Sequence, residues 1–571
     1  MSAPEKPPEL PIGYHVENLT TLLHGVMAQY ADLLTADEHT LVQQFDTLNH
    51  SAKSLFYRLL TRQGTLLRQD KLNYGDVPDL EATLVELEQA GLCHRNPPAA
   101  LPELLHLLTR PELICSFSPA GHSKLKKPEL VQRILEQQSE EDLRRHIQTR
   151  FPYVEARYQE AFTTFLVCFF GNSHQDLTEF VISELGHVRY ESYSLCRDTR
   201  YFQTREQIEH QLLYAQTRQQ LEDKTCLQDA DRLLALAQSL PAPDQHPHLQ
   251  RRYQSTLIPI ARQLERLQQW QPALGLFRLC DRHPSLERQA RILKKLGQPE
   301  ASLALCRQIR QHSQHPEALE FVDRFLPQLH KALGRPPLHK ALGRPPPPRP
   351  THTWPETHLS LTKPADTLTS KTPGEAVEWL AAAALSDQHH QCCYVENTLF
   401  NGLFGLLFWD IVFAAVPGAF INPFQRGPLD LHSEDFFPRR QPQIEARLQQ
   451  LTTQQWQDTM RQHFAAKAGI ANPFVFWEAL SPELLERALQ RIPPHHLHAV
   501  FRRMLQHPGL YRNGFPDLIR FAVDHQTHPS YELIEIKGPG DKLQANQIRW
   551  LNAFADAGIP ASVCWVHWEP A

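Results

Sequence analysis

The sequence predicts a multidomain protein, in which a mostly α-helical N-terminal part and a helical-repeat region precede a C-terminal α/β core. The chain has 571 residues, more than one ordinary domain holds, which suggests three or four domains. Amphipathic helical patterns dominate the first 329 residues, whereas strand-like and helix-like segments alternate near the C-terminus. A proline-rich stretch at 330–374 separates the two patterns and predicts a linker.

The composition is typical of a folded chain from a reducing compartment. Hydrophobic residues make up 41% and charged residues 21%, which excludes wholesale disorder. The net charge of −5 excludes a uniformly basic, histone-like protein, but not one that grips DNA through local basic patches. None of the ten cysteines forms a CxxC pair, so neither a zinc ribbon nor a disulfide framework is expected. The N-terminus has no basic region followed by an apolar run, so we expect no secretory signal.

Residues 1–100 predict helices around one short strand. Apolar positions recur at helical spacing in SAKSLFYRLLTRQ and in DLEATLVELEQAGL, which Gly91 closes. The segment GTLLRQDKLNY between them is strand-like and carries Arg68, with Arg62 just before it. Helix, strand and helix in this order favour a winged-helix-like DNA-binding surface. The same residues fit a helical adaptor with solvated charges equally well.

Residues 101–225 begin with two amphipathic helices around a lysine-rich loop. The loop GHSKLKK holds Lys124, Lys126 and Lys127 and no acidic residue, and Pro128 suits the start of the helix that follows. Ammonium groups beside a helix N-terminus suit phosphate contact. The predicted buried face of this helix comprises Leu130, Val131 and Leu135. The unit resembles a SAP module, so we predict a SAP-like module within a DNA-binding helical region.

Residues 226–329 predict antiparallel helix pairs, because small and large apolar residues alternate at a spacing similar to that of TPR repeats. Residues 251–350 contain 18 Lys and Arg against 7 Asp and Glu, an excess that could follow a phosphate backbone. Beyond them, HKALGRPP occurs twice and eight prolines lie within 330–355. We therefore expect the linker to be extended and semi-rigid.

The apolar segment 399–420 is long enough to span a bilayer, but it contains Asp410 near its middle and no closely flanking Lys or Arg. We therefore interpret it as a buried core helix. Helical steps back from Leu407 through Leu403 reach Glu396, which places this carboxylate on the inward-facing stripe where the helix opens. A glutamate at such a position indicates a functional group.

Two strand-like segments near the C-terminus carry the residues that indicate chemistry. RNGFPDLIRFAV places Asp517 on one face of a strand, and YELIEIKG places Glu535 and Lys537 on one face of the next. Pairing the strands as a hairpin brings the two carboxylates together. Such an arrangement is unfavourable unless a cation lies between them, so a divalent metal is expected. The lysine can orient a water or stabilise negative charge on a phosphate.

A predicted turn and amphipathic helix, GPGDKLQANQIRWLNAFADAG, follow these strands, and an apolar strand, ASVCWVHW, closes the unit. Lys542, Gln547 and Arg549 on this turn and helix would face the same site. Helix, strands, helix and strand with Glu, P-D, E-x-K and a later Gln match the order of the PD-(D/E)xK nuclease core. The segments ENTLFNGLFGLLFWDIVF, GFPDL and ELIEIKGPGDKLQANQIRWL resemble a VRR-NUC domain at 375–571.

The whole arrangement is similar to the Fanconi-associated nuclease family, in a bacterial-type form without the Cys/His spacing of a ubiquitin-binding zinc finger. The resemblance implies Mg²⁺ or Mn²⁺ held by Glu396, Asp517, Glu535 and the backbone carbonyl of Ile536, with Lys537 completing the catalytic set. It implies flapped or branched DNA as partner, with no membrane and no small-molecule cofactor. The candidate DNA contacts are Arg62, Arg68, Lys124, Lys126, Lys127, Lys542 and Gln547. Asn546 stands where the resemblance to animal members leads us to expect a basic residue, so the resemblance does not imply recognition of a flap's 5′ phosphate.

These features lead to a structure-selective DNA nuclease with 5′-flap endonuclease and 5′-to-3′ exonuclease activity as the first hypothesis, with a role in interstrand cross-link repair. A non-catalytic DNA-binding repair scaffold and a Holliday-junction resolvase are the alternatives. A scaffold would be free to lose the carboxylates that this sequence retains. A Holliday-junction resolvase is usually shorter and an obligate dimer. The expected location is the cytoplasm, beside the nucleoid in a bacterium, or the nucleus in a eukaryote.

Overall fold

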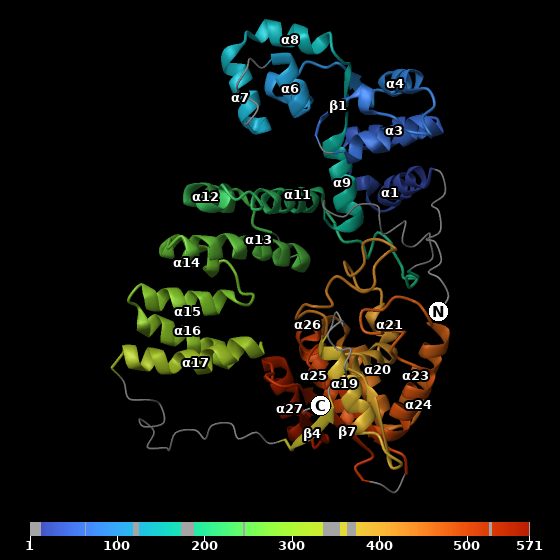
Figure 1. Ribbon diagram of the computed structural model, residues 1–571, viewed down its shortest axis with the longest axis vertical. Helices are drawn as coiled ribbons and strands as arrows, with labels where there is room; N and C mark the ends of the chain where they lie inside the picture. The colour runs from blue at the N-terminus through green and yellow to red at the C-terminus, as the bar shows by residue number, and fades with distance from the viewer. Residues whose placement is uncertain are drawn as a thin grey trace. The chain divides into compact units, whose positions relative to one another are not determined.

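The computed structural model describes residues 13–62, 64–117, 125–172, 188–243, 246–313, 315–334, 354–362, 373–524 and 528–569. The chain separates into two compact units. The first comprises Met1–His187 and Phe202–Gln216, and the second comprises Val188–Tyr201 and Thr217–Ala571. Helices dominate the first unit and the early part of the second, and a sheet lies near the C-terminus, as Figure 1 shows. The predicted fold class is therefore confirmed.

The first unit is built from helices around a small three-stranded sheet. Its strands are β1 (Leu66–Arg68), β2 (Cys93–Arg95) and β3 (Tyr153–Ala156), in the antiparallel order β1-β3-β2. Its helices are α1 (Tyr14–Tyr30), α2 (Ala36–Thr47), α3 (His50–Thr61), α4 (Leu80–Gln89), α5 (Leu101–His106), α6 (Arg110–Phe117), α7 (Lys127–Gln137), α8 (Glu140–Gln148), α9 (Gln159–Phe170) and most of α11 (Arg205–Gln220).

Local sequence explains where the N-terminal helices begin and end. The Asn49 side chain accepts a hydrogen bond from the Ala52 backbone at the start of α3, and Gly91 follows α4 with a left-handed φ of 72°. Both predicted helices are confirmed. The strand expected between them is short, because β1 ends at Arg68 and a 3₁₀ turn, Gln69–Lys71, follows.

The four short helices α5 to α8 share a hydrophobic core of their own. In α7, which begins at Lys127 with Pro128 in its first turn, Leu130, Val131 and Ile134 are buried. The predicted face is thus right for Leu130 and Val131, whereas Leu135 is only half-buried and Ile134 takes the inner position. The helix pair is confirmed, and the comparison with a SAP module stays a prediction.

The second unit begins with stacked helices in the repeat region, which Figure 1 shows as successive layers from α13 to α17. Neighbouring helices pack in chain order, as the predicted helix pairs require. Ala290 and Leu303 pack together in the core of the last three helices, a small residue against a large one. These helices are α12 (Ala230–Ser239), α13 (Pro247–Arg266), α14 (Trp270–Arg278), α15 (Ser285–Lys295), α16 (Pro299–His312) and α17 (Pro316–Ala332).

A five-stranded mixed sheet forms the centre of the C-terminal part. Its order is β4-β8-β7-β6-β5, in which β4, β8 and β7 are parallel and β6 is antiparallel to both of its neighbours. The strands are β4 (Glu356–Thr362), β5 (His390–Tyr394), β6 (Leu518–Ala522), β7 (Tyr531–Lys537) and β8 (Ala561–Glu569). The β6–β7 hairpin and the closing strand β8 are as predicted.

The edge strand β4 corrects the predicted linker at 330–374. Glu356–Thr362 pairs in register with β8 along its whole length, so this segment belongs to the sheet. Composition pointed to an extended linker, and an extended segment beside a free sheet edge pairs with it readily. The repeated HKALGRPP segments lie outside the described residues except for their first five positions.

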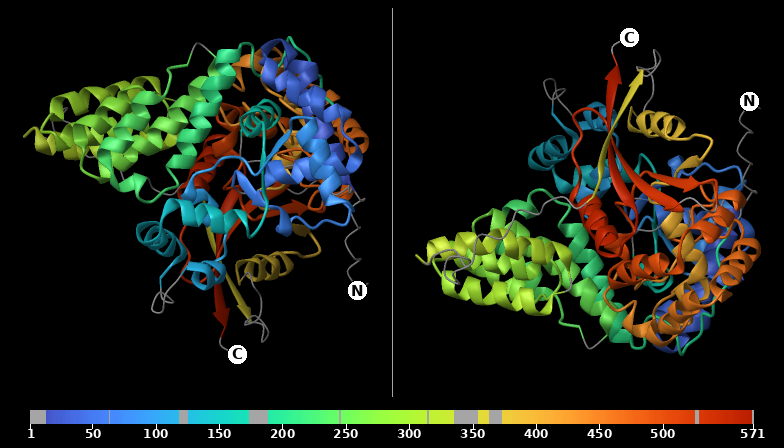
Figure 2. Two further views of the ribbon diagram at one scale, coloured as in Figure 1. Left: turned by 90° about the horizontal axis from the view of Figure 1, so that it is seen from above. Right: turned by 90° about the horizontal axis from the view of Figure 1, so that it is seen from below.

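Helices cover both faces of this sheet (Figure 2). On one face, Ala381 and Ala382 of α19 (Pro373–Ala384) pack against Leu518, Ile534 and Ile536. The other face packs on a larger core that includes α20, α25 and α27. The remaining helices are α20 (Leu399–Leu407), α21 (Trp409–Val412), α22 (Gln441–Gln449), α23 (Gln455–Ala466), α24 (Pro482–Arg491), α25 (Pro494–Gln506), α26 (Pro508–Tyr511) and α27 (Ala545–Asp556).

The apolar segment 399–420 is buried, as predicted, but it does not form one helix. It folds as α20 and the single turn α21, with Phe408 between them, and every residue of α20 is buried. Within the described parts of the chain, no helix is both long and apolar enough to cross a membrane.

Candidate active site at one end of the C-terminal sheet

Three neighbouring strands bring the predicted carboxylates to one end of the sheet. Tyr394 of β5 pairs with Leu518 of β6, and Leu518 pairs with Ile534 of β7. Asp517, which precedes β6, therefore lies beside the last residues of β5 and of β7. The Val395 amide donates a hydrogen bond to the Asp517 carbonyl at 2.8 Å, which anchors the turn that carries Glu396.

Asp517, Glu535 and Lys537 are almost fully buried, with exposed fractions of 7%, 1% and 8%. The Ile536 amide donates to Asp517 Oδ2 at 2.7 Å, which fixes the orientation of this carboxylate. Lys537 Nζ and Gln547 Nε2 both donate to Glu535 Oε1, each at 2.6 Å. The second hydrogen bond joins α27 to the strand, so Gln547 lies within the carboxylate cluster.

Glu396 lies in a turn and not on a helix, which corrects the sequence prediction. The helix begins only at Leu399, because Asn397 has a left-handed φ of 50° that interrupts helical geometry. The Asn397 Oδ1 accepts hydrogen bonds from the amides of Gly514 and Phe515, which binds the turn to the segment that leads into β6. The turn still directs Glu396 to the predicted place, since Tyr394 Oη donates to its Oε2 at 2.7 Å.

The electrostatics of this cluster are dominated by burial and by repulsion between carboxylates. Burial raises the pKa of Asp517, and the nearby Glu396 raises it further. Burial likewise raises the pKa of Glu535, with an added contribution from Asp517, while Lys537 opposes the rise. One ammonium group therefore compensates only part of the negative charge.

Glu378 of α19 is a further carboxylate near the cluster that the sequence prediction missed. Burial raises its pKa to about 7, and the charges of Asp517 and Glu396 raise it as well. Its Oε2 is buried and has no hydrogen-bond partner within the described residues. The signal in the sequence is the isolated glutamate of AVEWLAAAA, the single charge in an otherwise apolar helical segment.

This donor set fits a hard divalent cation. Carboxylate oxygens are the ligands that Mg²⁺ and Mn²⁺ prefer, and a cation relieves the repulsion that raises the pKa values of Asp517 and Glu535. Ile536, whose backbone carbonyl is the fourth predicted ligand, lies between Glu535 and Lys537 on β7. The residues present therefore match the chemistry that the sequence prediction requires.

The other predicted DNA contacts near this site differ in their surroundings. Lys542 is exposed, in the segment before α27. Arg549 does not face the site, which corrects the prediction. Its guanidinium pairs with Glu320 of α17 at 2.9 Å, a partner 229 residues away in the sequence.

Of the two arginines predicted to contact DNA in the first unit, one is exposed and the other forms ion pairs. Arg62 is exposed and lies over the Tyr74 ring, whereas Arg68 is held by both Asp70 and Glu112. These two arginines border one cavity of about 500 Å³.

The lysine-rich loop of the first unit is partly described. Lys126 is exposed, and Lys127 Nζ donates to the His106 carbonyl at 2.7 Å. Lys124 lies outside the described residues. The DNA-binding role of all these residues stays a prediction.

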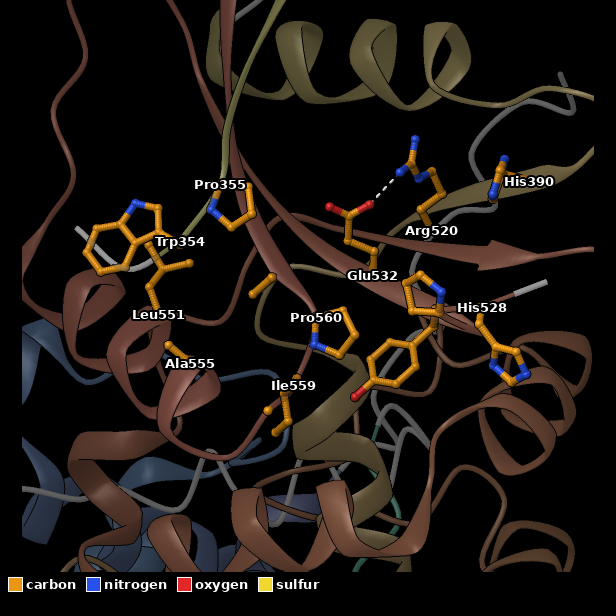
Figure 3. A pocket seen from close by; sticks show the side chains of 14 residues that line it. Trp354, Pro355, His390, Arg520, His528, Glu532, Leu551, Ala555, Ile559 and Pro560 are labelled. Carbon is orange, nitrogen blue, oxygen red and sulfur yellow. Dashed lines mark hydrogen bonds and ion pairs between the residues drawn. The ribbon is translucent and has the colours of Figure 1, made fainter. Parts of the chain in front are cut away.

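A cavity of about 500 Å³ lies at the opposite end of β7 (Figure 3). Figure 3 shows an apolar wall with Trp354 and Leu551, and a polar wall where Arg520 pairs with Glu532. Glu535 and Lys537 do not line this cavity. The carboxylate cluster and the cavity are therefore separate features of the same sheet.

Two family models match the sequence. The model of the VRR-NUC domain matches residues 451–568, a range that contains Asp517, Glu535 and Lys537. The model of the FAN1 HTH domain matches residues 13–94, which contain β1 and its flanking helices α3 and α4.

Whole-length relatives are similar to the chain as well. The Fanconi-associated nuclease 1 homolog of Pseudomonas aeruginosa is 33% identical over 560 residues, covering 97% of this chain and 96% of that protein. The homolog of Arabidopsis thaliana is 25% identical over 612 residues, covering 96% of this chain and 66% of that protein. The crystal structure of paFAN1 bound to 2-nt 5′-flap DNA with a gap superposes with a TM-score of 0.82 at 32% identity, covering 99% of this chain and all of that one.

Proposed function

Because this chain belongs to the Fanconi-associated nuclease family, we propose that it is a structure-selective DNA nuclease with 5′-flap endonuclease and 5′-to-3′ exonuclease activity. The single observation that carries the proposal is the cluster at one end of the sheet, in which the half-buried Glu396 lies near the buried Asp517 and Glu535 beside Lys537. The similar crystal structure with bound 5′-flap DNA supports flapped DNA as the substrate class.

Glu396, Asp517, Glu535 and the carbonyl of Ile536 would hold Mg²⁺ or Mn²⁺, and Glu378 adds a nearby carboxylate. Bound there, a divalent ion polarises the scissile phosphate and lowers the pKa of the attacking water. The proposed ligands are already oriented by the chain, since the Ile536 amide holds Asp517 and Tyr394 Oη holds Glu396. Such preorganisation reduces the free energy needed to assemble the site.

Lys537 is the proposed catalytic cation. Its ammonium group lies 2.6 Å from Glu535 Oε1, and so within the cluster of proposed metal ligands. From this position it orients the attacking water or stabilises the charge that develops on the phosphate. Gln547 also holds Glu535 in place, through the hydrogen bond from α27 to the same oxygen, Oε1.

Basic side chains away from the cluster would hold the arms of the DNA. The exposed Arg62, Lys126 and Lys542 are the candidates best suited to phosphate contact, and the repeat region contributes its excess of Lys and Arg. Contacts of this kind make binding strongly dependent on salt. A nuclease with this preference would serve in DNA repair, including repair of interstrand cross-links, beside the nucleoid in a bacterium or in the nucleus of a eukaryote.

End-labelled 5′-flap, splayed and four-way DNA tests the proposal with Mg²⁺, Mn²⁺ or EDTA. We expect metal-dependent cleavage of the flap, loss of product with Asp517→Asn, and full activity with Asp556→Asn, an exposed control on α27. Equal product from Asp517→Asn and the unmodified chain would exclude this active site. Binding without any cleavage would favour a repair scaffold, and symmetric cutting of four-way junctions alone would favour a resolvase.

A further inference from the structure

A second cluster of metal-binding side chains lies in the repeat region, apart from the catalytic carboxylates. It consists of His283, just before α15, and of His315 and Glu317 at the start of α17. One potential ligand atom from each residue lies within 4.8 Å of the others. Two imidazoles and one carboxylate form a donor set that differs from the all-oxygen catalytic site.

The orientation of His283 suits a metal ligand. Its Nδ1 lies 2.7 Å from Glu287 Oε1, which is within ion-pair distance. Its Nε2 lies 3.2 Å from Glu317 Oε2. A carboxylate beside one ring nitrogen is common among metal-binding histidines, and it leaves the other nitrogen for the metal. Two electron-rich atoms facing each other at this distance require a cation between them, either a proton or a metal ion.

His315 supplies a second imidazole. Its ring stacks on that of His283 with centroids 4.0 Å apart and planes 8° from parallel. Its Nδ1 is buried and has no hydrogen-bond partner in the described part of the chain. A buried nitrogen without a partner is costly, and coordination would satisfy it.

We propose that His283, His315 and Glu317 bind a divalent transition-metal ion of the zinc class. Imidazole nitrogens together with a carboxylate favour Zn²⁺ and its neighbours over Mg²⁺. Ligand atoms around a tetrahedral ion with bonds of about 2.1 Å lie about 3.4 Å apart, so side-chain rotations that shorten the present separations by up to about 1.4 Å complete the site. The proposal does not depend on the proposed nuclease activity.

The His283, His315 and Glu317 cluster lies where the last repeat helices contact the C-terminal core. His507, which lies between α25 and α26 of the C-terminal core, approaches the His315 ring edge-on at 5.2 Å. The neighbouring Arg549 of α27 pairs with Glu320 of α17 at 2.9 Å. The ion would therefore bind where the last repeat helices meet the core within the second unit, and it would fix α15 and α17 against each other at that junction.

Titration of the metal-stripped full chain tests this site directly. All proteins carry Asp517→Asn, which weakens metal binding at the catalytic carboxylates. Co²⁺ is the spectroscopic probe, and Zn²⁺ is then added to displace the bound Co²⁺. We expect a visible absorption band of low-symmetry Co²⁺ that is lost in His283→Ala and in His315→Ala. The matched control is His312→Ala, an exposed histidine at the end of α16, and it should retain the band.

Thermal unfolding of the same proteins supplies a second readout. In the Asp517→Asn background, Zn²⁺ should raise the Tm of the chain with no further change and of the His312→Ala control, and it should leave the Tm of His283→Ala unchanged. His283 is exposed, so its removal preserves the fold even where loss of the more buried His315 does not. Equal Zn²⁺ affinity in the chain with no further change and in His283→Ala, or no Co²⁺ band in either, would overturn the proposal and assign the cluster to a protonated histidine between two glutamates.

Discussion

Arg68 with its two acids in the first unit and the carboxylate cluster in the second are both sets of neighbouring charges, but the charges are balanced differently. Arg68 is 9% exposed and binds Asp70 and Glu112 at 2.6 and 2.8 Å. Burial opposes ionisation of Glu112, yet hydrogen bonds from Thr109 and Arg68 outweigh it and hold its pKa at about 2. In the second unit, burial and mutual repulsion raise the pKa values of Asp517 and Glu535, and Lys537 offsets only part of this rise.

The charges around Arg68 stabilise the fold, whereas the carboxylate cluster is suited to binding a ligand. In the first region, the Arg68 guanidinium donates to both carboxylates and Thr109 adds two hydrogen bonds to Glu112, so the chain itself satisfies these charges. Where several acids share one ammonium group, the folded chain carries a free-energy cost that a bound cation would offset. Removing a residue should therefore affect activity in the second region and stability in the first.

The largest expected effect is loss of activity when the cluster loses a carboxylate. Asp517→Asn or Glu535→Gln should reduce flap cleavage about 10³-fold or more, because each change removes a proposed ligand from a preorganised site. Single-turnover cleavage of a labelled flap measures the effect. Retention of near-normal rates by both variants would show that this cluster is not the active site.

Lys537→Met should have the next largest effect, a decrease in the cleavage rate of about 10²-fold, as expected for one charged group that acts on the transition state. The variant should still bind Mn²⁺, because lysine is not a proposed ligand. Calorimetry of Mn²⁺ binding beside the cleavage assay separates the two roles. A variant that lost metal binding and activity together would assign Lys537 to holding Glu535 rather than to catalysis.

In the first unit, Arg68→Ala should lower the free energy of unfolding by about 1 kcal/mol, because it removes the shared partner of two partly exposed carboxylates. The midpoint of urea denaturation of the first unit, followed in the full chain, measures this. The matched control is Arg62→Ala, since Arg62 is exposed and pairs with no acid among the described residues. Equal midpoints for the two variants would contradict the comparison.

Arg62→Ala should instead act on DNA. If Arg62 contacts one phosphate, its removal should decrease the slope of log binding constant against log salt concentration by about 0.9 without changing stability. Binding of flap DNA by fluorescence anisotropy at several salt concentrations checks this. An unchanged slope would remove Arg62 from the DNA contacts.

The smallest effect concerns acid stability. Because the pKa of Glu112 is depressed in the folded chain, its contribution to stability is present above its ordinary value of 4.5 and is lost as the pH falls toward about 2. Arg68→Ala should flatten this dependence, since it removes one of the donors that lower the pKa. Denaturation midpoints of both proteins between these pH values measure the difference, and parallel curves would count against the ion pair.

The sequence predicted most of the C-terminal core, because alternation with period two and helical periodicity are local properties. Strand β7, helix α27 and strand β8 lie where those patterns placed them. Glu396 was assigned to a helix because periodicity does not reveal that Asn397 interrupts it. Glu378 was missed because no motif surrounds it, and only folding brings α19 beside Asp517.

Pairing between distant parts of the chain explains the other differences between the sequence prediction and the structure. The strand β4 was hidden in a proline-rich context, and its partner β8 is about 200 residues away in the chain. Arg549 was expected at the active site because it follows Gln547 closely, but a carboxylate of α17 binds it. Local patterns therefore predicted the elements, while the partners of individual charges needed the structure.

Binding of Mn²⁺ to the full chain, measured by calorimetry in buffers with different ionisation enthalpies, tests the central claim most directly. If the buried carboxylates form a metal site, the unmodified chain binds Mn²⁺ and releases protons near pH 7, because the pKa of Glu535 is raised. The Glu535→Gln variant should lose both signals. Equal binding and equal proton release by the two proteins would contradict the account.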